Sequence, residues 1–147
     1  MTTRTSNKAI TLQYVKTVGM VNDGDNGRGF ANPYDVAIGK TGSIYVINRC
    51  DVPRRRGMRI GICTLDEDYL GEFGHGYGSR DGQFTWPVAL AFDSQDKLYI
   101  TDEQTHRISI FDEAGNYQGK WGSFGDKPGQ LAGPAGIAID ADDNVYI

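Results

Sequence analysis

The sequence has little of the residue types on which metal and redox chemistry depends. Only two cysteines and two histidines occur among its 147 residues. Neither cysteine has a histidine or a second cysteine at zinc-ligand spacing, so no zinc motif is present and we expect no cofactor. An excess of positive charge is also missing, because the formal net charge is −4. This excludes a field over the whole molecule that would attract nucleic acid.

Long apolar runs are missing as well. No segment approaches the roughly 20 apolar residues that a membrane-spanning helix needs. Residues 1–8 lack the apolar stretch of a secretory signal peptide. We therefore expect residues 1–9 to be a flexible leader, no membrane partner, and the cytoplasm as the default location.

What the sequence does have is a repeat, cut off in its third copy. Residues 33–47, 87–101 and 134–147 each begin at a proline, run through a short apolar segment and a turn, and end in a second apolar segment. Each second segment carries a tyrosine in register, and these are Tyr45, Tyr99 and Tyr146. They lie 54 and 47 positions apart, a period typical of a propeller blade.

Two further segments complete each unit. Residues 59–63 match residues 107–111, and both alternate as strands do. The turn that follows leads to a fourth segment, residues 69–74 in one unit and 117–122 in the next. The sequence therefore predicts an all-β fold, a β-propeller of four-stranded antiparallel blades that is incomplete at the C-terminus.

The predicted organisation covers residues 10–147 as a partial propeller. We expect one blade over residues 33–74, a second over 87–122 and the start of a third over 134–147. Residues 10–20 share the fourth-strand pattern, so we expect a lone fourth strand there. On this interpretation the chain is the N-terminal portion of a longer protein, and closure of the ring requires further blades from the same chain or from other copies.

A family resemblance is carried by residues 98–102 and 105–112, which read Leu-Tyr-Ile-Thr-Asp and Thr-His-Arg-Ile-Ser-Ile-Phe-Asp. This pattern resembles the NHL repeat, with Thr105 where that repeat usually has Asn. The resemblance extends over about residues 30 to 147. It implies a propeller, and NHL propellers include binding scaffolds, RNA readers and lyases.

The strand order also assigns the loops to two ends of the molecule. Because successive strands are antiparallel, the first-to-second and third-to-fourth turns share one end, and these turns are short and acidic. We call this the short-turn end. The other connections are long, namely residues 48–58, 74–87 and 122–134, and we call their end the long-loop end. Long irregular loops on rigid strands favour this end as the functional one.

Candidate ligand contacts gather at the long-loop end. The loop of residues 48–58 is six residues longer than its counterpart in the next blade and is rich in arginine, which suits carboxylate or phosphate groups. A solvated surface loop remains the alternative. The full candidate set is Arg49, Arg54, Arg55, Arg56, His75, Tyr77, Arg80, Trp86, Phe124 and Lys127.

Several of these residues also have structural interpretations. Tyr77 and Trp86 could instead pack between blades. His106 occupies the repeat's own turn position, and Arg107 is expected to bridge to Asp102, the polar residue that ends the preceding strand. Cys63 is expected to be a small buried hydrophobe, with a disulfide to Cys50 as the alternative.

Three functions follow in order of preference. The first is a non-catalytic propeller that binds a protein or peptide through its long-loop end. The second is a propeller-type lyase or hydrolase, similar to peptidyl-hydroxyglycine lyase, whose metal and catalytic residues would lie in further blades. That enzyme's histidines would fall at the positions of Gly82-Gln83 and Gly129-Gln130, where this sequence has none. The third is RNA binding through the arginine-rich loop.

Overall fold

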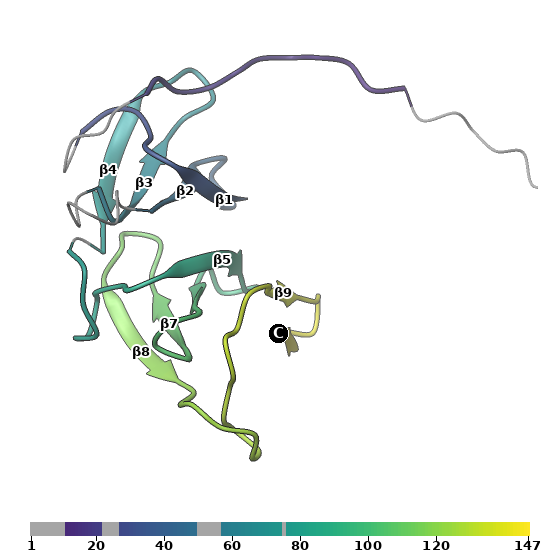
Figure 1. Ribbon diagram of the computed structural model, residues 1–147. Coiled ribbons are helices and arrows are strands. Elements are labelled where there is room, and N and C mark those ends of the chain that lie inside the picture. The colour runs from purple at the N-terminus through teal and green to yellow at the C-terminus, as the bar shows by residue number, and fades with distance from the viewer. Residues whose placement is uncertain (1–10, 22–26, 50–56, 75) are drawn as a thin grey trace, which may run out of the picture.

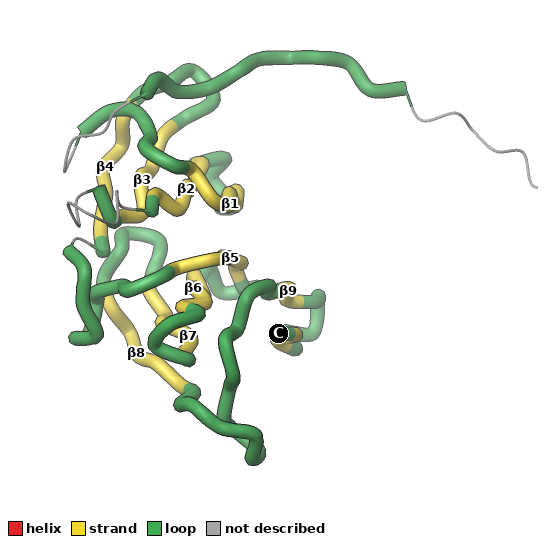
Figure 2. Tube along the Cα trace, viewed as in Figure 1, coloured by secondary structure: helices red, strands yellow, loops and turns green. Residues whose placement is uncertain are grey.

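The structure, a computed structural model, describes residues 11–21, 27–49, 57–74 and 76–147. Figures 1 and 2 show strands and connecting loops in this part of the chain, and none of the described residues forms a helix. Accordingly, no described helix is long and apolar enough to cross a membrane. The predicted all-β class is confirmed.

The strands form two four-stranded antiparallel sheets and a short third one. The first blade contains β1 (Pro33–Ile38), β2 (Ile44–Asn48), β3 (Arg59–Cys63) and β4 (Tyr69–Phe73). The second contains β5 (Pro87–Phe92), β6 (Leu98–Asp102), β7 (Arg107–Phe111) and β8 (Tyr117–Trp121). A further pair consists of β9 (Ala138–Ile139) and β10 (Val145–Tyr146). In Figure 1 the sheets are arranged in an arc, with β1, β5 and β9 innermost and β4 and β8 outermost.

The two blades share one register. Pro33 is opposite Asn48 in the first blade, and Pro87 is opposite Asp102 in the second. Each inner pair has an irregularity directly after its proline, where the proline ring leaves no N–H for the ladder. The repeated sequence therefore produces repeated backbone geometry as well.

Aromatic packing joins the first blade to the second. Phe84 lies in the connection between them and is fully buried. Its ring centroid is 5.7 Å from that of Phe111, which in turn lies 4.8 Å from that of Phe73. Burial of such large side chains between sheets stabilises each blade only through its neighbour.

The connection that leaves each fourth strand repeats a tight turn. Gly74 has a φ of +74°, and a β-carbon there would lie 2.2 Å from the Phe84 ring. Only glycine combines this positive φ with so close a contact. The turn continues into an isolated parallel bridge in each copy, and these bridges are Val21–Phe30, Tyr77–Phe84 and Phe124–Leu131.

The segment before the first blade has the same bridge but no strand. Residues 11–20 are not assigned to a strand in the structure. Gly19 has a φ of +105° and contacts Phe30, as its counterpart Gly74 contacts Phe84. The expectation that residues 10–20 act as a fourth strand of another blade stays a prediction, since it needs a neighbouring strand to pair with.

The interpretation of Cys63 as a buried hydrophobe holds. Cys63 is a free thiol with 8% of its surface exposed. Burial, followed by the negative charge of Glu67, raises the pKa of this thiol. Cys50 lies outside the described residues.

Candidate functional site

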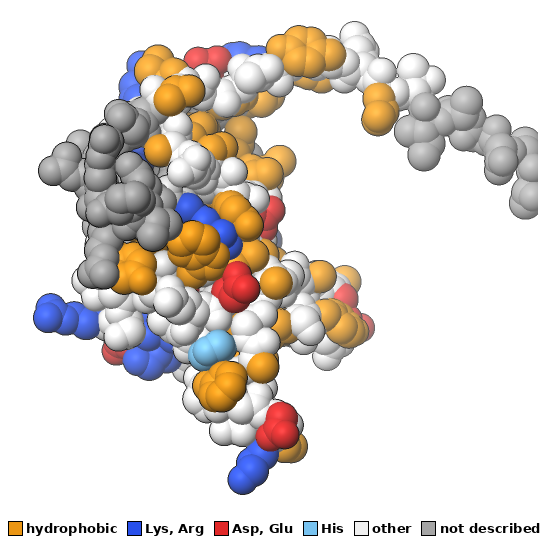
Figure 3. Space-filling view, viewed as in Figure 1, with side chains coloured by type: hydrophobic (Ala, Val, Ile, Leu, Met, Phe, Trp, Pro, Cys, Tyr) orange, Lys and Arg blue, Asp and Glu red, His pale blue; other side chains and the backbone are white. Residues whose placement is uncertain are grey.

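The long-loop end carries a hollow in the second blade. Its volume is about 500 Å³, and its lining residues are Tyr77, Trp86, Glu103, Gln104 and His106. Figure 3 shows this face, on which a histidine lies beside hydrophobic side chains and close to an acidic one. Two of the residues predicted from the sequence, Tyr77 and Trp86, are thus brought together here.

The other predicted residues are distributed differently. Arg80 and Lys127 are exposed and lie outside the lining of the hollow. Phe124 is 70% exposed and lies against His106, with 4.7 Å between the ring centroids. Four predicted residues lie outside the described part of the chain, namely Arg54, Arg55, Arg56 and His75.

Arg49 is held inside the joint between the two blades. Its side chain contacts two aromatic rings, with the guanidinium carbon 3.3 Å from the Tyr34 centroid and 4.4 Å from the Trp86 centroid. Its Nε donates a hydrogen bond to the carbonyl of Pro87 at 2.8 Å. Only 5% of the residue is exposed. Arg49 therefore fills this joint and offers little surface to a ligand.

The electrostatics of this joint follow from its burial. Desolvation lowers the pKa of the Arg49 guanidinium, while nearby Tyr34 and Glu103 act in the opposite direction. Its Nη2 atom is buried and has no hydrogen-bond partner among the described residues. The aromatic faces of Tyr34 and Trp86 thus provide much of the stabilisation that this cation receives.

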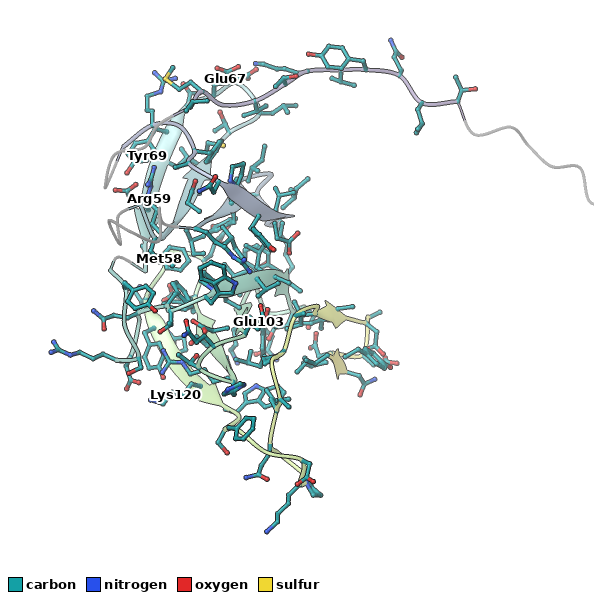
Figure 4. The ribbon with its side chains drawn as sticks, in the orientation of Figure 1. Met58, Arg59, Glu67, Tyr69, Glu103 and Lys120 are labelled. Atoms are coloured by element: carbon teal, nitrogen blue, oxygen red, sulfur yellow. The ribbon has the colours of Figure 1, made fainter. Side chains whose placement is uncertain are left out.

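Glu103 occupies in the second blade the position that Arg49 occupies in the first. The N–H of Arg49 donates to the Asn32 carbonyl at 3.2 Å, and the N–H of Glu103 donates to the Trp86 carbonyl at 3.1 Å. Figure 4 shows Glu103 on the loop that follows β6, facing the segment that runs towards β9. The same backbone position therefore carries opposite charge in consecutive blades.

The residues facing these two side chains also differ. Arg49 lies over Trp86, which precedes the proline of β5. The residue before the next proline is Gly133, where a β-carbon would lie 3.6 Å from Cγ of Glu103. Arg49 thus faces the indole of Trp86, whereas Glu103 faces a glycine that has no side chain. This absence of a side chain helps to leave the hollow open.

His106 supports the hollow as well as lining it. Its φ of +53° is the left-handed conformation expected of a turn residue. Its Nδ1 accepts a hydrogen bond from the N–H of Gly133 at 3.0 Å. In the neutral imidazole the proton then resides on Nε2, which can donate to another group.

A buried carboxylate fixes the backbone on both sides of the hollow. Asp102 is fully buried, and its two oxygens accept four backbone hydrogen bonds. The donors are the N–H groups of Thr85 at 2.7 Å, Trp86 at 3.1 Å, Gln104 at 3.2 Å and Thr105 at 2.9 Å. Trp86 and Gln104 are thereby positioned by one rigid group.

Arg107 is structural, but the expected bridge to Asp102 is wrong. Its guanidinium instead donates to the carbonyls of Ser79 at 2.7 Å, Arg80 at 3.1 Å and Gln83 at 2.8 Å. Three carbonyls of one loop match the several donors of a guanidinium, and the carboxylate is already saturated by N–H groups. Arg107 therefore anchors the loop that presents Tyr77.

Glu103 and Gln104 were not predicted from the sequence. Gln104 accepts a hydrogen bond from the Tyr77 hydroxyl at 3.4 Å, which closes one wall of the hollow. The signal for Glu103 was present in the repeat alignment, because it aligns with the selected Arg49. The alignment does not show that Gly133 lies beside Glu103, where the first joint has the indole of Trp86 beside Arg49.

At the short-turn end, acidic side chains accept hydrogen bonds from groups of their own turns. Asp140 accepts hydrogen bonds from the backbone and side-chain nitrogens of Asn144 and from the Tyr146 hydroxyl. Led by the Asn144 side chain, these donors lower the pKa of Asp140 to about 2. Among the described residues, no group of three or more His, Cys, Asp or Glu side chains is placed to hold a metal ion.

Comparison with known proteins shows which of them are similar to this chain. The model of a family described as 6-bladed beta-propeller matches residues 88–147. NHL repeat-containing protein 3 of Homo sapiens is 25% identical over 114 residues, 76% of this chain and 31% of that protein. The chain is thus similar to NHL-repeat β-propeller proteins. A shorter match is to Protein brain tumor of Drosophila melanogaster, 37% identical over 54 residues, or 37% of this chain and 5% of that protein.

Solved structures share the fold of this chain. Virginiamycin B lyase from Staphylococcus aureus aligns with a TM-score of 0.51 and 24% identity, covering 77% of this chain and 33% of that one. Hydrazine synthase of Kuenenia stuttgartiensis aligns with a TM-score of 0.54 and 16% identity, covering 89% and 31%. Identities this low establish the fold alone. The chain spans about a third of the length of NHL repeat-containing protein 3.

Proposed function

We propose that this NHL-repeat chain is a non-catalytic scaffold that captures a protein or peptide at its long-loop end. The supporting observation is the hollow between Tyr77, Trp86, Glu103, Gln104 and His106. It combines aromatic surface with a few polar groups, a composition typical of recognition sites.

The rigidity of the surrounding backbone supports the same function. Asp102 and Arg107 fix the loops on two sides of the hollow through seven hydrogen bonds to backbone groups. A pre-organised surface loses little conformational entropy when a partner binds. The strands thus act as a frame for the binding surface.

The two tryptophans of the chain provide a matched test. A phage-displayed library of random peptides would be panned against the chain, and the enriched peptides measured against Trp86→Ala and Trp121→Ala. Trp121 lies on the outer strand β8, away from the lining of the hollow. We expect Trp86→Ala to weaken binding at least tenfold and Trp121→Ala to change it less than twofold. Equal affinity for the Trp86→Ala protein, or no enrichment, would contradict the proposal.

A further inference from the structure

One backbone position carries opposite charges in the two consecutive blades, and this difference indicates the charge of the ligand. In the joint between the first and second blades, a cation of the chain itself, Arg49, lies against the rings of Tyr34 and Trp86. In the next joint the equivalent residue is the anion Glu103, and the facing residue is Gly133. The second joint therefore has a carboxylate and open space where the first has a cation and an indole.

We propose that the hollow beside Glu103 binds the cationic side chain of a lysine or arginine in a bound polypeptide. This inference rests on the proposed scaffold function and adds the chemistry of what the scaffold recognises. The incoming cation pairs with the carboxylate of Glu103. Its aliphatic stem lies along the rings of Trp86 and Tyr77.

The charge accessible in the hollow favours a cation. Glu103 is exposed, and within the described part of the chain its carboxylate has no hydrogen bond or ion pair. The neighbouring Asp102 is fully buried and saturated by backbone N–H groups. Arg49 is only 5% exposed and lies against the Trp86 ring, so it does not present its charge to a ligand. Glu103 thus supplies the accessible charge of the lining.

The polar groups of the hollow argue against a purely apolar occupant. A norleucine or leucine side chain would cover Glu103 and Gln104 without replacing the water bound to their oxygens, which is costly. Lysine has the four-carbon chain of norleucine and adds an ammonium donor at its end, and arginine likewise ends in donor groups. The Nε2–H of His106 remains able to donate to a carbonyl of the bound polypeptide.

A nuclear magnetic resonance titration tests this assignment. With Trp121→Phe as background, the indole N–H of Trp86 is the only tryptophan side-chain signal, since the sequence has two tryptophans. The probes are acetylated, amidated peptides Gly-Gly-X-Gly-Gly with X as lysine, arginine, norleucine or glutamate. We expect saturable shifts of the Trp86 signal with lysine and arginine, at least fivefold weaker binding with norleucine, and no binding with glutamate.

Two charge-removing variants complete the test. Glu103→Gln should weaken the lysine peptide about fivefold, the factor expected for one partly exposed ion pair. The control Asp142→Asn removes an exposed carboxylate from the short-turn end and should leave the affinity unchanged. Both positions are exposed, so the free proteins should keep their unfolding temperature.

The outcomes separate the two proposals. The cation site would be overturned if the norleucine peptide bound as tightly as the lysine peptide, or if Glu103→Gln left the affinity unchanged. Saturable shifts of the Trp86 signal in those experiments would still support peptide capture. Equal losses in Glu103→Gln and Asp142→Asn would also overturn it, because they would indicate non-specific attraction to an acidic protein. An absence of shifts with every peptide would overturn it too, and the panning against Trp86→Ala would then decide the scaffold function by itself.

Discussion

The carboxylate of Asp35 on β1 accepts a hydrogen bond from the backbone N–H of Leu90 on β5, with 2.9 Å between the two atoms. Leu90 directly follows the irregularity after Pro87, where the inner strand leaves its regular pairing. A side chain of the first blade therefore satisfies a backbone donor of the second. The equivalent residue of the second blade is Ala89, which cannot repeat this contact.

We expect Asp35→Ala to lower the free energy of unfolding by about 1 to 2 kcal/mol, because the N–H of Leu90 would lose its acceptor in a partly buried joint. Urea unfolding followed by tyrosine and tryptophan fluorescence measures this change. The control is Lys40→Ala, which removes an exposed inter-blade ion pair to Asp96 at 3.0 Å. That variant should change the free energy by less than about 0.5 kcal/mol. Equal effects of the two variants would show that the Asp35 contact has no special role.

A larger effect is expected at Asp102. In Asp102→Asn one carboxylate oxygen becomes an NH₂ group that faces backbone N–H donors, so hydrogen bonds are replaced by a donor–donor contact. We expect a loss of about 2 to 4 kcal/mol in the free energy of unfolding. The matched control Asp142→Asn makes the same chemical change at an exposed site and should cost less than about 0.5 kcal/mol.

The Asp102 variant should also disturb the hollow. Its carboxylate holds the N–H groups of Trp86 and Gln104, which both line the site. Under conditions where the variant stays folded, we expect the fluorescence of Trp86 in the Trp121→Phe background to change its emission maximum. An unchanged spectrum would mean that the backbone of the hollow is held by other contacts.

A substitution at Arg107 tests whether the shape of its guanidinium, and not only its charge, holds the loop that precedes β5. Lysine keeps the charge but offers one nitrogen where the guanidinium reaches three carbonyls from two nitrogens. We expect Arg107→Lys to lower the free energy of unfolding by about 1 to 2 kcal/mol, since partly buried carbonyls lose their donors. Arg80→Lys, at an exposed position of the same loop, should be neutral. If both variants unfolded at the same urea concentration as the parent chain, the three hydrogen bonds would contribute nothing net.

The sequence predicted the blades well because their information is local and repeated. Alternation, turn residues and the register of Tyr45 with Tyr99 sufficed to place the strands, and the structure has them there. The partners of polar side chains were harder to predict. Arg107 and Asp102 stand opposite each other in the register, as expected, yet the side chain of each forms hydrogen bonds to backbone groups of the loops.

The hollow itself depends on contacts between blades that no single repeat contains. Arg49 was selected for its charge, but the rings of Tyr34 and Trp86 bury it. The alignment of Glu103 with Arg49 is a weak signal by itself, because acidic residues are common in this acidic sequence. The significance of Glu103 arises only when Gly133, 30 residues further along the chain, is placed beside it.

Tyr45 gives the fold a specific response to alkaline pH. Its hydroxyl donates to the carbonyl of Glu113 in the next blade at 2.8 Å, and only 2% of the residue is exposed. Burial, followed by the negative charges of Glu113, Asp96 and Asp112, raises its pKa from 10.0 to about 12. The folded state thus favours the neutral phenol more strongly than the unfolded state does.

The sign of the resulting pH dependence follows directly. Because the pKa is higher in the folded protein, the contribution of Tyr45 to stability is complete below pH 10 and is lost as the pH rises through about 12. Absorbance at the phenolate band should therefore show a component that ionises near pH 12 in the parent chain and is missing from Tyr45→Phe. Tyr34, which is 55% exposed, supplies the control, because Tyr34→Phe should leave that component in place. If the component near pH 12 survived in Tyr45→Phe, the contact between Tyr45 and the Glu113 carbonyl would not be its source.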